Sequence, residues 1–454
     1  MPPTSPPRSW RETETRDRCR KVSAARHQIA RQAERLIAAC ANAQRTDPVE
    51  TLTGELFPLC AALKFIGSQG PKVLRSRKLG AWGRPLWLWG VRSEVRREPL
   101  GDVLILAAWN YPLLLPGVQL AQGLAAGNRV WLKPAPGCEA ASELLVESFH
   151  AAGVPRDAIG LLGSSPQAAQ DRIDQGVDLV VLTGGSTTGQ AVMTRCAPRL
   201  TPAVMELSGC DAVIVGPGAD LGLVAKAVAF GLRFNAGATC IGPRRIIVGS
   251  DTRGELIERL RERLADTPAV AVHPSARDTA TRLIREALAQ GGTDLLRREG
   301  EAIPAPEDGR MRPVIIGDVG ADWPIASADL FAPVASLIVA DDDARRAEIV
   351  NGCRFRLAAS IFGDTAWATP LAGRLDVGHV SINDLIFPTS DPRVPFGGCG
   401  QSGFGVTRGE EGLLAMTRPK VIANHRGKGR LHLGDRKESD LKTLLGFLRW
   451  THRG

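Results

Sequence analysis

One candidate nucleophile is Cys240, which lies in residues 235–243 (NAGATCIGP) after a predicted helix. Gly237 and Ala238 carry little or no side chain, so another segment or a ligand can approach this loop closely. Exposed backbone N–H groups beside the sulfur would lower the pKa of the thiol and favour the nucleophilic thiolate. Position alone does not select this cysteine, because other cysteines also occupy predicted turns, and an ordinary core cysteine is the alternative.

A carboxylate and an amide occupy two further strand ends. Glu206 closes the apolar run 202–207 (PAVMEL), where burial would raise its pKa towards the range of a general base. A structural salt bridge is its alternative role. Asn110 follows the apolar run 102–108, where its amide could donate to a developing oxyanion or could satisfy the backbone of the turn.

Residues 183–189 (TGGSTTG) follow the apolar run 177–182 and open a predicted helix. Backbone N–H groups and hydroxyls at a helix N-terminus suit a phosphate or pyrophosphate, although an ordinary strand–helix turn is the alternative. Residues 398–403 match the dinucleotide-binding pattern G-x-G-x-x-G letter for letter. They do not follow a buried strand, so we interpret this second match as coincidental.

Alternating strands and helices must position these groups. Helices of about ten or more residues separate the predicted apolar strands, at 102–108, 128–132, 158–162, 177–182 and 202–207. This pattern predicts a parallel sheet covered on both faces, with ligands at its strand ends. A second α/β region is predicted to follow, with strands at 212–215, 244–249, 313–316, 334–339 and 378–382.

The composition of the 454 residues, 44% hydrophobic and 23% charged, excludes disorder, collagen and coiled coil as descriptions of the whole chain. The net charge of +9 is confined to the two ends, since residues 1–31 and 425–454 each carry eight Lys and Arg against three acids. The residues between the two ends have a net charge of −1, so no nucleic-acid partner is expected. Prolines interrupt the uncharged stretch 103–128, which favours a strand, a turn and a helix over a membrane span.

The nine cysteines are odd in number and include no C-x-x-C and no Cys/His cluster at zinc spacing. Neither a disulfide framework nor a metal site is expected. The Pro-rich, charged N-terminus has no apolar core of a secretory signal. These features together predict a cytoplasmic protein.

The chain resembles the aldehyde dehydrogenase superfamily over roughly residues 20–424. Seven motifs occur in the family's order: REPLGDVLILAAWNYP (97–112), GNRVWLKPAP (127–136), LTGGSTTG (182–189), MELSG (205–209), GATCIGPRR (237–245), ADLFAPV (328–334) and PFGGCGQSGFG (395–405). The gap of 34 residues between Glu206 and Cys240 also agrees with the family. The MELSG and TCIGP variants are most similar to class 3-like members.

The resemblance implies hydrolytic oxidation of a small-molecule aldehyde to a carboxylic acid with NAD or NADP. Cys240 would form a thiohemiacetal and then a thioester, Asn110 and the Cys240 N–H would stabilise the oxyanion, and Glu206 would activate water. The implied cofactor-binding residues are Trp109, Lys133, Gly184, Ser186, Gly189, Asp329 and Phe331. An acylating, CoA-dependent enzyme is an alternative, but such relatives commonly lack the glutamate.

Three departures from the family pattern leave the cofactor choice open. Asp329 stands where the family has a glutamate that holds the nicotinamide ribose, so this contact is expected to be longer or water-mediated. Pro136 replaces the glutamate with which many NAD-preferring members bind the adenosine ribose. Ser186 and Thr187 also differ from the commoner phosphate turn.

The fold implied by the resemblance is α/β, with a Rossmann-like cofactor-binding domain, a second α/β catalytic domain and a small β bridging or oligomerisation element that pairs subunits into a homodimer. The assigned residues are 11–80 and 99–208 for the cofactor-binding domain, 209–412 for the catalytic domain, 81–98 and 413–424 for the bridging element, and 1–10 and 425–454 for basic tails. Residues 441–448 predict a short amphipathic helix that could make weak contact with a membrane surface or pack on protein. A degenerate, non-enzymatic scaffold is the last alternative.

Overall fold

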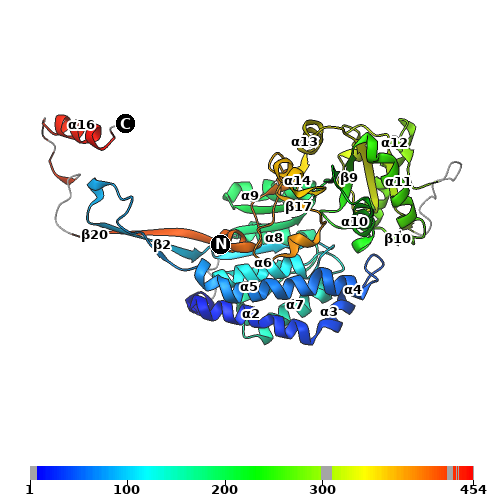
Figure 1. Ribbon diagram of the computed structural model, residues 1–454. Coiled ribbons are helices and arrows are strands. Elements are labelled where there is room, and N and C mark those ends of the chain that lie inside the picture. The colour runs from blue at the N-terminus through cyan, green and yellow to red at the C-terminus, as the bar shows by residue number, and fades with distance from the viewer. Residues whose placement is uncertain (1–7, 298–308, 427–432, 436, 438, 453–454) are drawn as a thin grey trace. The chain divides into compact units, whose positions relative to one another are not determined.

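The computed structural model describes residues 8–297, 309–426, 433–435, 437 and 439–452. The chain divides into two units (Figure 1). The larger comprises Met1–Arg75 and Arg97–Arg418, and the smaller comprises Ser76–Arg96 and Pro419–Gly454. Both predicted α/β regions belong to the larger unit.

The first sheet of the larger unit has six strands in the order β19-β7-β6-β3-β4-β5. All its pairings are parallel except that of β19 with β7. The bounds are β3 (Asp102–Leu106), β4 (Arg129–Lys133), β5 (Ile159–Leu161), β6 (Leu179–Gly184), β7 (Ala203–Leu207) and β19 (Gly403–Phe404). The predicted parallel sheet is therefore confirmed.

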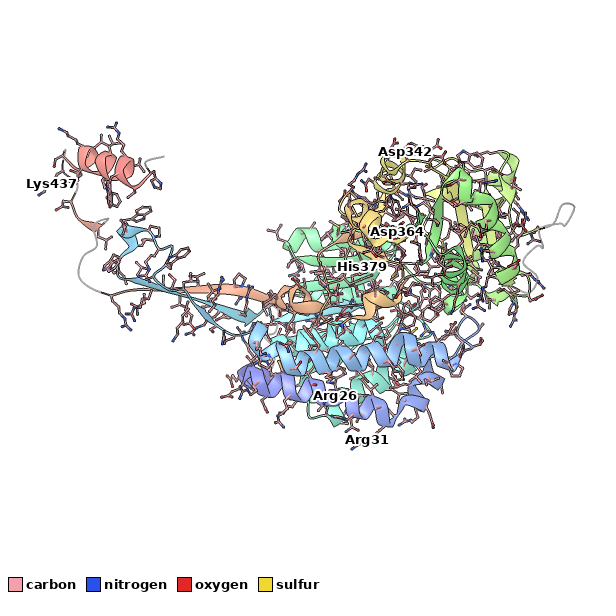
Figure 2. All side chains as sticks on the ribbon, in the orientation of Figure 1. Arg26, Arg31, Asp342, Asp364, His379 and Lys437 are labelled. Carbon is pink, nitrogen blue, oxygen red and sulfur yellow. The ribbon has the colours of Figure 1, made fainter. Side chains whose placement is uncertain are left out.

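Side chains alternate between the two faces of this sheet. Val103 and Ile105 of β3 pack into one core with the helices α2 (Thr15–Arg31), α5 (Phe57–Val73), α6 (Leu114–Ala126) and α7 (Glu139–Ala151). Leu104 and Leu106 pack into another, with α8 (Pro166–Gln175) and α9 (Ser186–Cys196). Arg31 on the outer surface of α2 is exposed to solvent (Figure 2).

The second sheet has seven strands in the order β11-β13-β14-β9-β8-β16-β17. Only β11 runs antiparallel to its neighbour. The bounds are β8 (Asp211–Val215), β9 (Pro243–Val248), β11 (Thr293–Asp294), β13 (Val314–Gly317), β14 (Val334–Val339), β16 (Ala358–Phe362) and β17 (His379–Ile382). Its helices are α10 (Leu221–Arg233), α11 (Ser250–Leu264), α12 (Pro274–Ala289), α13 (Asp343–Asn351) and α14 (Thr365–Ala372).

Three predicted domain limits differ from the structure. The strand β19 and the helix α15 (Gly409–Ala415) join the first sheet and the helices α5 and α6, although residues 209–412 were assigned to the catalytic domain. The chain returns there because β19 pairs with β7. Residues 8–10 are not a tail: they begin the helix α1 (Arg8–Glu12), in which Trp10 is buried and donates to the carbonyl of Leu124 at 3.2 Å.

The smaller unit contains a three-stranded sheet in the order β1-β2-β20 and the helix α16 (Asp440–Thr451). The strands are β1 (Arg77–Lys78), β2 (Val91–Pro99) and β20 (Thr417–His425). Of the predicted basic tails, residues 1–7, 427–432, 436, 438 and 453–454 lie outside the described residues. The other short elements are α3 (Ala33–Cys40), α4 (Pro48–Thr51), β10 (Val270–Ala271), β12 (Arg310–Met311), β15 (Phe355–Arg356) and β18 (Cys399–Gly400).

Candidate active site

The loop that carries Cys240 begins in a left-handed backbone conformation. Asn235 has φ 51° and ψ 40°, and Ala236 has φ 53° and ψ 30°, which are uncommon for residues with a Cβ atom. Gly237 follows with φ 74°, and a Cβ atom there would lie 2.7 Å from the carbonyl carbon of Ala332. Such geometry persists only where the surroundings enforce it.

A buried arginine, Arg244, helps to hold the nucleophile loop in this left-handed conformation. The guanidinium of Arg244 donates to the carbonyls of Gly237 at 2.5 Å and Thr239 at 3.1 Å. It also donates to the carbonyl of Ala332 at 2.8 Å, within the ADLFAPV motif. Arg244 therefore fixes the nucleophile loop against a second loop of the site.

The turn after β3 binds the same loop directly. The side-chain amide of Asn110 donates to the carbonyl of Ala238 at 3.0 Å, and that of Asn235 donates to the carbonyl of Asn110 at 2.8 Å. The hydroxyls of Tyr111 and Thr239 are 2.8 Å apart. Asn110 is thus beside the nucleophile loop, and one N–H of its amide is engaged there.

A buried ion pair, Arg45–Glu55, supports this turn from the N-terminal helices. Glu55 accepts the backbone N–H groups of Leu113 and Leu114 at 2.6 and 2.9 Å, at the start of α6. Arg45 donates to the carbonyl of Asn110. Sequence reasoning missed this pair, because nothing in residues 45–55 signals contact with a turn more than fifty residues later.

Cys240 lines a cavity that opens to solvent, and its empty space, with the open part included, is about 470 Å³. Most of the wall is apolar and includes Leu114, Leu115, Phe234, Ile386, Phe387 and Phe396. Burial raises the pKa of the Cys240 thiol to about 12, and the charge of the buried Asp211 acts in the same direction. The expectation of a lowered thiol pKa is therefore wrong for the structure as described, since the removal of the sulfur from water outweighs the nearby donors.

Glu206 lies in β7 and is 4% exposed. Its Oε2 accepts from the amide of Gln119 at 2.8 Å and from the hydroxyl of Thr183 at 3.2 Å. Thr407 donates to Oε1. Burial raises the pKa of Glu206, and these donors partly oppose the rise. No arginine or lysine forms a salt bridge with it among the described residues, so the structural salt bridge considered from the sequence is not seen.

Arg408 is the charged residue in the wall of the Cys240 cavity. Its guanidinium donates to the carbonyl of Thr389 at 2.7 Å and lies 4.7 Å from the ring centre of Phe396. Desolvation lowers the pKa of Arg408, and the charges of Glu206 and Cys240 oppose that effect. Its positive charge in turn favours the thiolate of Cys240. Sequence reasoning did not single out this residue.

Several predicted cofactor-binding residues lie near one another. The ring of Trp109 is 6.1 Å from that of Phe331 and 5.7 Å from that of His273. Asp329, whose pKa is raised by burial, has a buried Oδ1 atom that finds no hydrogen-bond partner among the described residues. An orphaned carboxylate oxygen of this kind fits a site that receives a hydroxyl group from a ligand.

The predicted phosphate turn has the backbone needed for an anion. Gly185 caps α9, and a Cβ atom there would meet no atom within 4 Å. The hydroxyl of Ser186, however, donates to the carbonyl of Gln401 at 3.0 Å. Gly189 packs against Leu207, where a Cβ atom would lie 3.0 Å from its side chain. Lys133 ends β4, and partial burial lowers the pKa of its amine.

The G-x-G-x-x-G match at 398–403 has a structural role. Gly403, with φ 102°, pairs with Glu206 between β19 and β7. The hydroxyl of Ser402 donates to the carbonyl of Ser208 at 2.8 Å. The segment therefore supports the strand that carries Glu206, and its glycines allow the close approach of two backbones.

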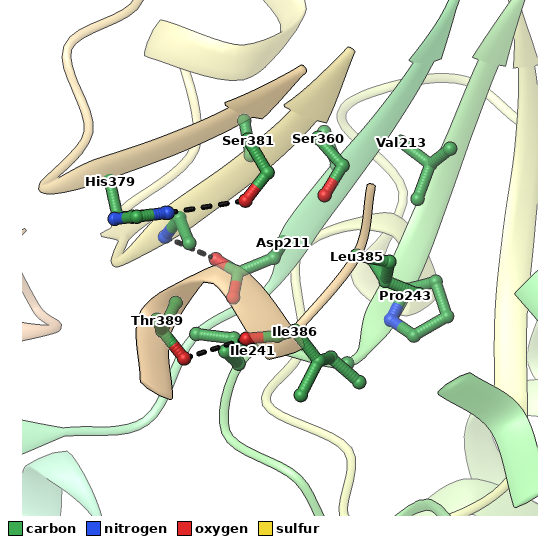
Figure 3. Close-up of a pocket in the computed structure, with 14 residues that line it drawn as sticks. Asp211, Val213, Ile241, Pro243, Ser360, His379, Ser381, Leu385, Ile386 and Thr389 are labelled. Atoms are coloured by element: carbon green, nitrogen blue, oxygen red, sulfur yellow. Dashed lines mark hydrogen bonds between the residues drawn. The ribbon is translucent and has the colours of Figure 1, made fainter. Parts of the chain in front are cut away.

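A second, smaller cavity, whose empty space including its open part is about 260 Å³, lies beside the nucleophile loop (Figure 3). Asp211 points into it, with Oδ1 accepting the N–H of Ala358 at 2.8 Å and Oδ2 without a partner. His379 and Ser381 form a hydrogen bond of 3.1 Å on the same wall. Burial raises the pKa of Asp211 well above its usual range. The charge of Asp211 in this cavity contributes to the raised pKa of the Cys240 thiol.

Two further features are absent from the described part of the chain. Its helices include none with the length and apolarity to cross a membrane. It also holds no group of three or more His, Cys, Asp and Glu side chains arranged to bind a metal ion.

Comparison with known proteins identifies the family. The sequence model of the Aldehyde dehydrogenase family matches residues 5–422. The chain is 31% identical over 422 residues to a protein of Methylomonas sp named 4,4'-diapolycopene aldehyde oxidase, covering 90% of this chain and 78% of that protein. It is 30% identical over 383 residues to a succinate-semialdehyde dehydrogenase [NADP(+)] of Deinococcus radiodurans, covering 81% and 78%.

The solved structures agree with the sequence relatives. The aldehyde dehydrogenase of Mycobacterium tuberculosis complexed with NAD+ has a TM-score of 0.81 and 26% identity, and the likeness covers 91% of this chain and 86% of that one. The resemblance read from seven motifs is confirmed, as is the α/β, Rossmann-like fold. The chain belongs to the aldehyde dehydrogenase family.

Proposed function

We propose that this protein oxidises an aldehyde to a carboxylic acid with NAD+ or NADP+, through a thiohemiacetal and a thioester on Cys240. One observation carries the proposal: Cys240 lines an apolar cavity, while the Asn110 turn is hydrogen-bonded to its loop. Membership of the aldehyde dehydrogenase family supports the reaction class.

In the first step the sulfur of Cys240 attacks the aldehyde carbon, and the carbonyl oxygen becomes an alkoxide. The backbone N–H of Cys240 and the second N–H of the Asn110 amide are the proposed donors to this oxygen. The thiol must give its proton to a base as the sulfur attacks, because its pKa of about 12 leaves it protonated at neutral pH. The carboxylate of Glu206 is the proposed acceptor, and it releases this proton to solvent before the later attack of water. Arg408 assists by favouring the thiolate.

When bound, the nicotinamide cofactor supplies the chemistry of hydride acceptance. Asp329, Trp109 and Phe331 are the proposed contacts of its nicotinamide half, which the orphaned Oδ1 atom of Asp329 supports. Gly184, Ser186, Gly189 and Lys133 would hold the pyrophosphate and adenosine portions. Residue 136 is proline, so nothing acidic at that position opposes a 2′-phosphate, and both cofactors remain in the proposal.

Glu206 is the proposed base that takes a proton from water as the water attacks the thioester. Burial raises the pKa of Glu206, which makes its carboxylate a stronger base than an exposed glutamate. The presence of this glutamate favours hydrolysis over transfer of the acyl group to CoA, the second candidate function.

The cavity wall favours an aldehyde with an apolar body. Leucine, isoleucine and phenylalanine side chains dominate it, and Arg408 contributes the charge. The names of two relatives, 4,4'-diapolycopene aldehyde oxidase and coniferyl aldehyde dehydrogenase, refer to substrates of this kind. A long or aromatic aldehyde is accordingly the proposed substrate class.

We also propose the domain roles, compartment and assembly expected from the sequence. The first sheet would bind the cofactor, the second would carry the nucleophile, and the β2 and β20 ribbon would pair subunits into a homodimer. All nine cysteines are free thiols, which supports a reducing cytoplasmic compartment.

The test is a panel of aliphatic, aromatic and carboxylated aldehydes with NAD+ and NADP+, followed by the absorbance of the reduced nicotinamide. Wild-type protein is expected to form reduced cofactor and carboxylic acid in equal amounts, without CoA. Cys240→Ala should abolish both products, whereas Cys60→Ala, a control at a partly buried cysteine outside the site, should not. Turnover that persists in Cys240→Ala, or that requires CoA, would refute the proposal.

A further inference from the structure

We propose that the smaller unit docks the enzyme on an anionic lipid surface. The contact would use the loop 82–89 and the helix α16, and it would leave the β2 and β20 ribbon available for pairing subunits. This inference goes beyond the proposed catalytic function and does not depend on it.

Charge is the first observation. The smaller unit holds fourteen Lys and Arg against four acidic residues, a net charge of +10. The whole chain has a net charge of +9, so the larger unit sums to −1. The smaller unit therefore accounts for the net charge of the chain, because acids elsewhere in the larger unit offset the basic segment 1–31, and it contains none of the proposed catalytic residues. Such a cluster attracts anionic lipid headgroups.

Exposed aromatic residues are the second observation. Four of the nine tryptophans belong to the smaller unit, and their exposed fractions are 101% for Trp82, 57% for Trp87, 78% for Trp89 and 59% for Trp450. No tryptophan described in the larger unit is exposed to this degree. Tryptophan is enriched at membrane–water interfaces, because its ring is apolar and its N–H group is polar.

The helix α16 supplies the third observation. Leu441, Leu444, Leu445 and Leu448 follow the spacing of one helix face and are 68%, 62%, 40% and 54% exposed. At 100° per residue, Lys442 and Arg449 lie beside this face. The ring contact of the helix with the loop uses Phe447 instead, whose centre is 6.4 Å from that of Trp87. Among the described residues of the unit, none covers the leucine face.

The interleaving of these residues favours lipid over a second protein copy. Basic residues stand next to the apolar ones, as in Leu441-Lys442 and Arg449-Trp450. The core of a protein–protein interface is depleted in lysine, whereas helices that lie on membranes combine Lys and Arg with Trp and Leu.

The experiment is co-sedimentation of the full chain with phosphatidylcholine vesicles that contain about one-third phosphatidylserine, and with phosphatidylcholine alone. Leu444→Glu/Leu448→Glu tests the apolar face, and Lys442→Gln/Arg449→Gln tests the charge. The matched control is Met193→Glu/Leu200→Glu, which adds two acids at exposed apolar positions of the larger unit. Aldehyde oxidation without vesicles should be equal in all four proteins and reports that each is folded.

Wild type and control are expected to bind the anionic vesicles and to be released by salt. The glutamine variant should bind about 25-fold more weakly, since each basic residue near the surface contributes about fivefold. The leucine-face variant should not bind. Absence of binding, equal binding to neutral vesicles, or equal loss in the control would overturn the proposal. So would a lipid-free assembly that the leucine-face variant dissociates, because the occupant would then be a second copy.

Discussion

Replacement of Thr407 by valine should move the pH dependence of thioester hydrolysis to higher pH. Thr407 is 2% exposed, and its hydroxyl donates to Oε1 of Glu206. Valine keeps the shape of threonine and removes this donor. Because a donor to a carboxylate stabilises the ionised form, its loss raises a pKa that burial has already raised.

The size of the shift follows from the one interaction removed. A hydrogen bond to a charged group is worth about 1.5–3 kcal/mol. At about 1.4 kcal/mol for each pKa unit, the pKa of Glu206 should rise by about one to two units. Glu206 acts as a base only when ionised, so hydrolysis on the acidic limb should fall by about ten- to a hundredfold. The rate at high pH should be unchanged.

The assay is single-turnover release of carboxylic acid from the acyl-enzyme as a function of pH, which isolates hydrolysis from hydride transfer. Thr194→Val is the matched control, because this exposed threonine donates only within its own helix, to the carbonyl of Gln190 at 2.9 Å. Glu206→Gln should abolish the acidic limb together with most of the hydrolysis. The reasoning fails if Thr407→Val titrates like wild type, or if Glu206→Gln retains the limb.

Three further changes test the surroundings of the nucleophile. Asp211→Asn removes a charge that raises the pKa of Cys240, so alkylation by iodoacetamide should begin at lower pH; an unchanged alkylation profile would contradict this. Gly237→Ala places a Cβ atom 2.7 Å from a carbonyl carbon at φ 74°, which should lower the free energy of unfolding by about 1–3 kcal/mol in urea and should reduce turnover. Glu55→Gln leaves Arg45 buried without its counter-charge and should cost about 3–5 kcal/mol by the same urea measurement, whereas wild-type stability would show that the pair contributes nothing.

Strands of the fold were predictable where the residues are β-branched or long aliphatic ones. The predicted strand 334–339 coincides with β14, and the run 177–182 became β6 (Leu179–Gly184). The sequence did not reveal β16 (Ala358–Phe362), which lies between β8 and β17, because its first three residues are Ala, Ala and Ser. These small residues suit a crowded sheet interior, but they carry little strand propensity by themselves.

Some residues of the candidate site were predictable from local sequence, and others were not because their role depends on distant contacts. Glu206 and Asn110 follow or end apolar runs, Cys240 lies in a small-residue loop after a predicted helix, and the motif order drew attention to all three. Arg45 and Glu55 carry charges in a helical region, where charged residues usually face solvent. Their burial depends on contacts with a turn far along the chain, which local sequence does not encode. The direction of the Cys240 pKa was mistaken for the same reason, since the depth of burial is a tertiary property.

Buried arginines explain how irregular loops can surround the nucleophile at all. A buried loop has backbone carbonyls that no helix or sheet satisfies, and each unpaired carbonyl is costly. Arg244 donates to three such carbonyls, Arg45 to that of Asn110, and Arg408 to that of Thr389. A guanidinium offers five donors in a planar arrangement and stays charged when buried, which lysine does not match. The same cations that satisfy the loops therefore place positive charge around Cys240, where a thiolate and an oxyanion must form.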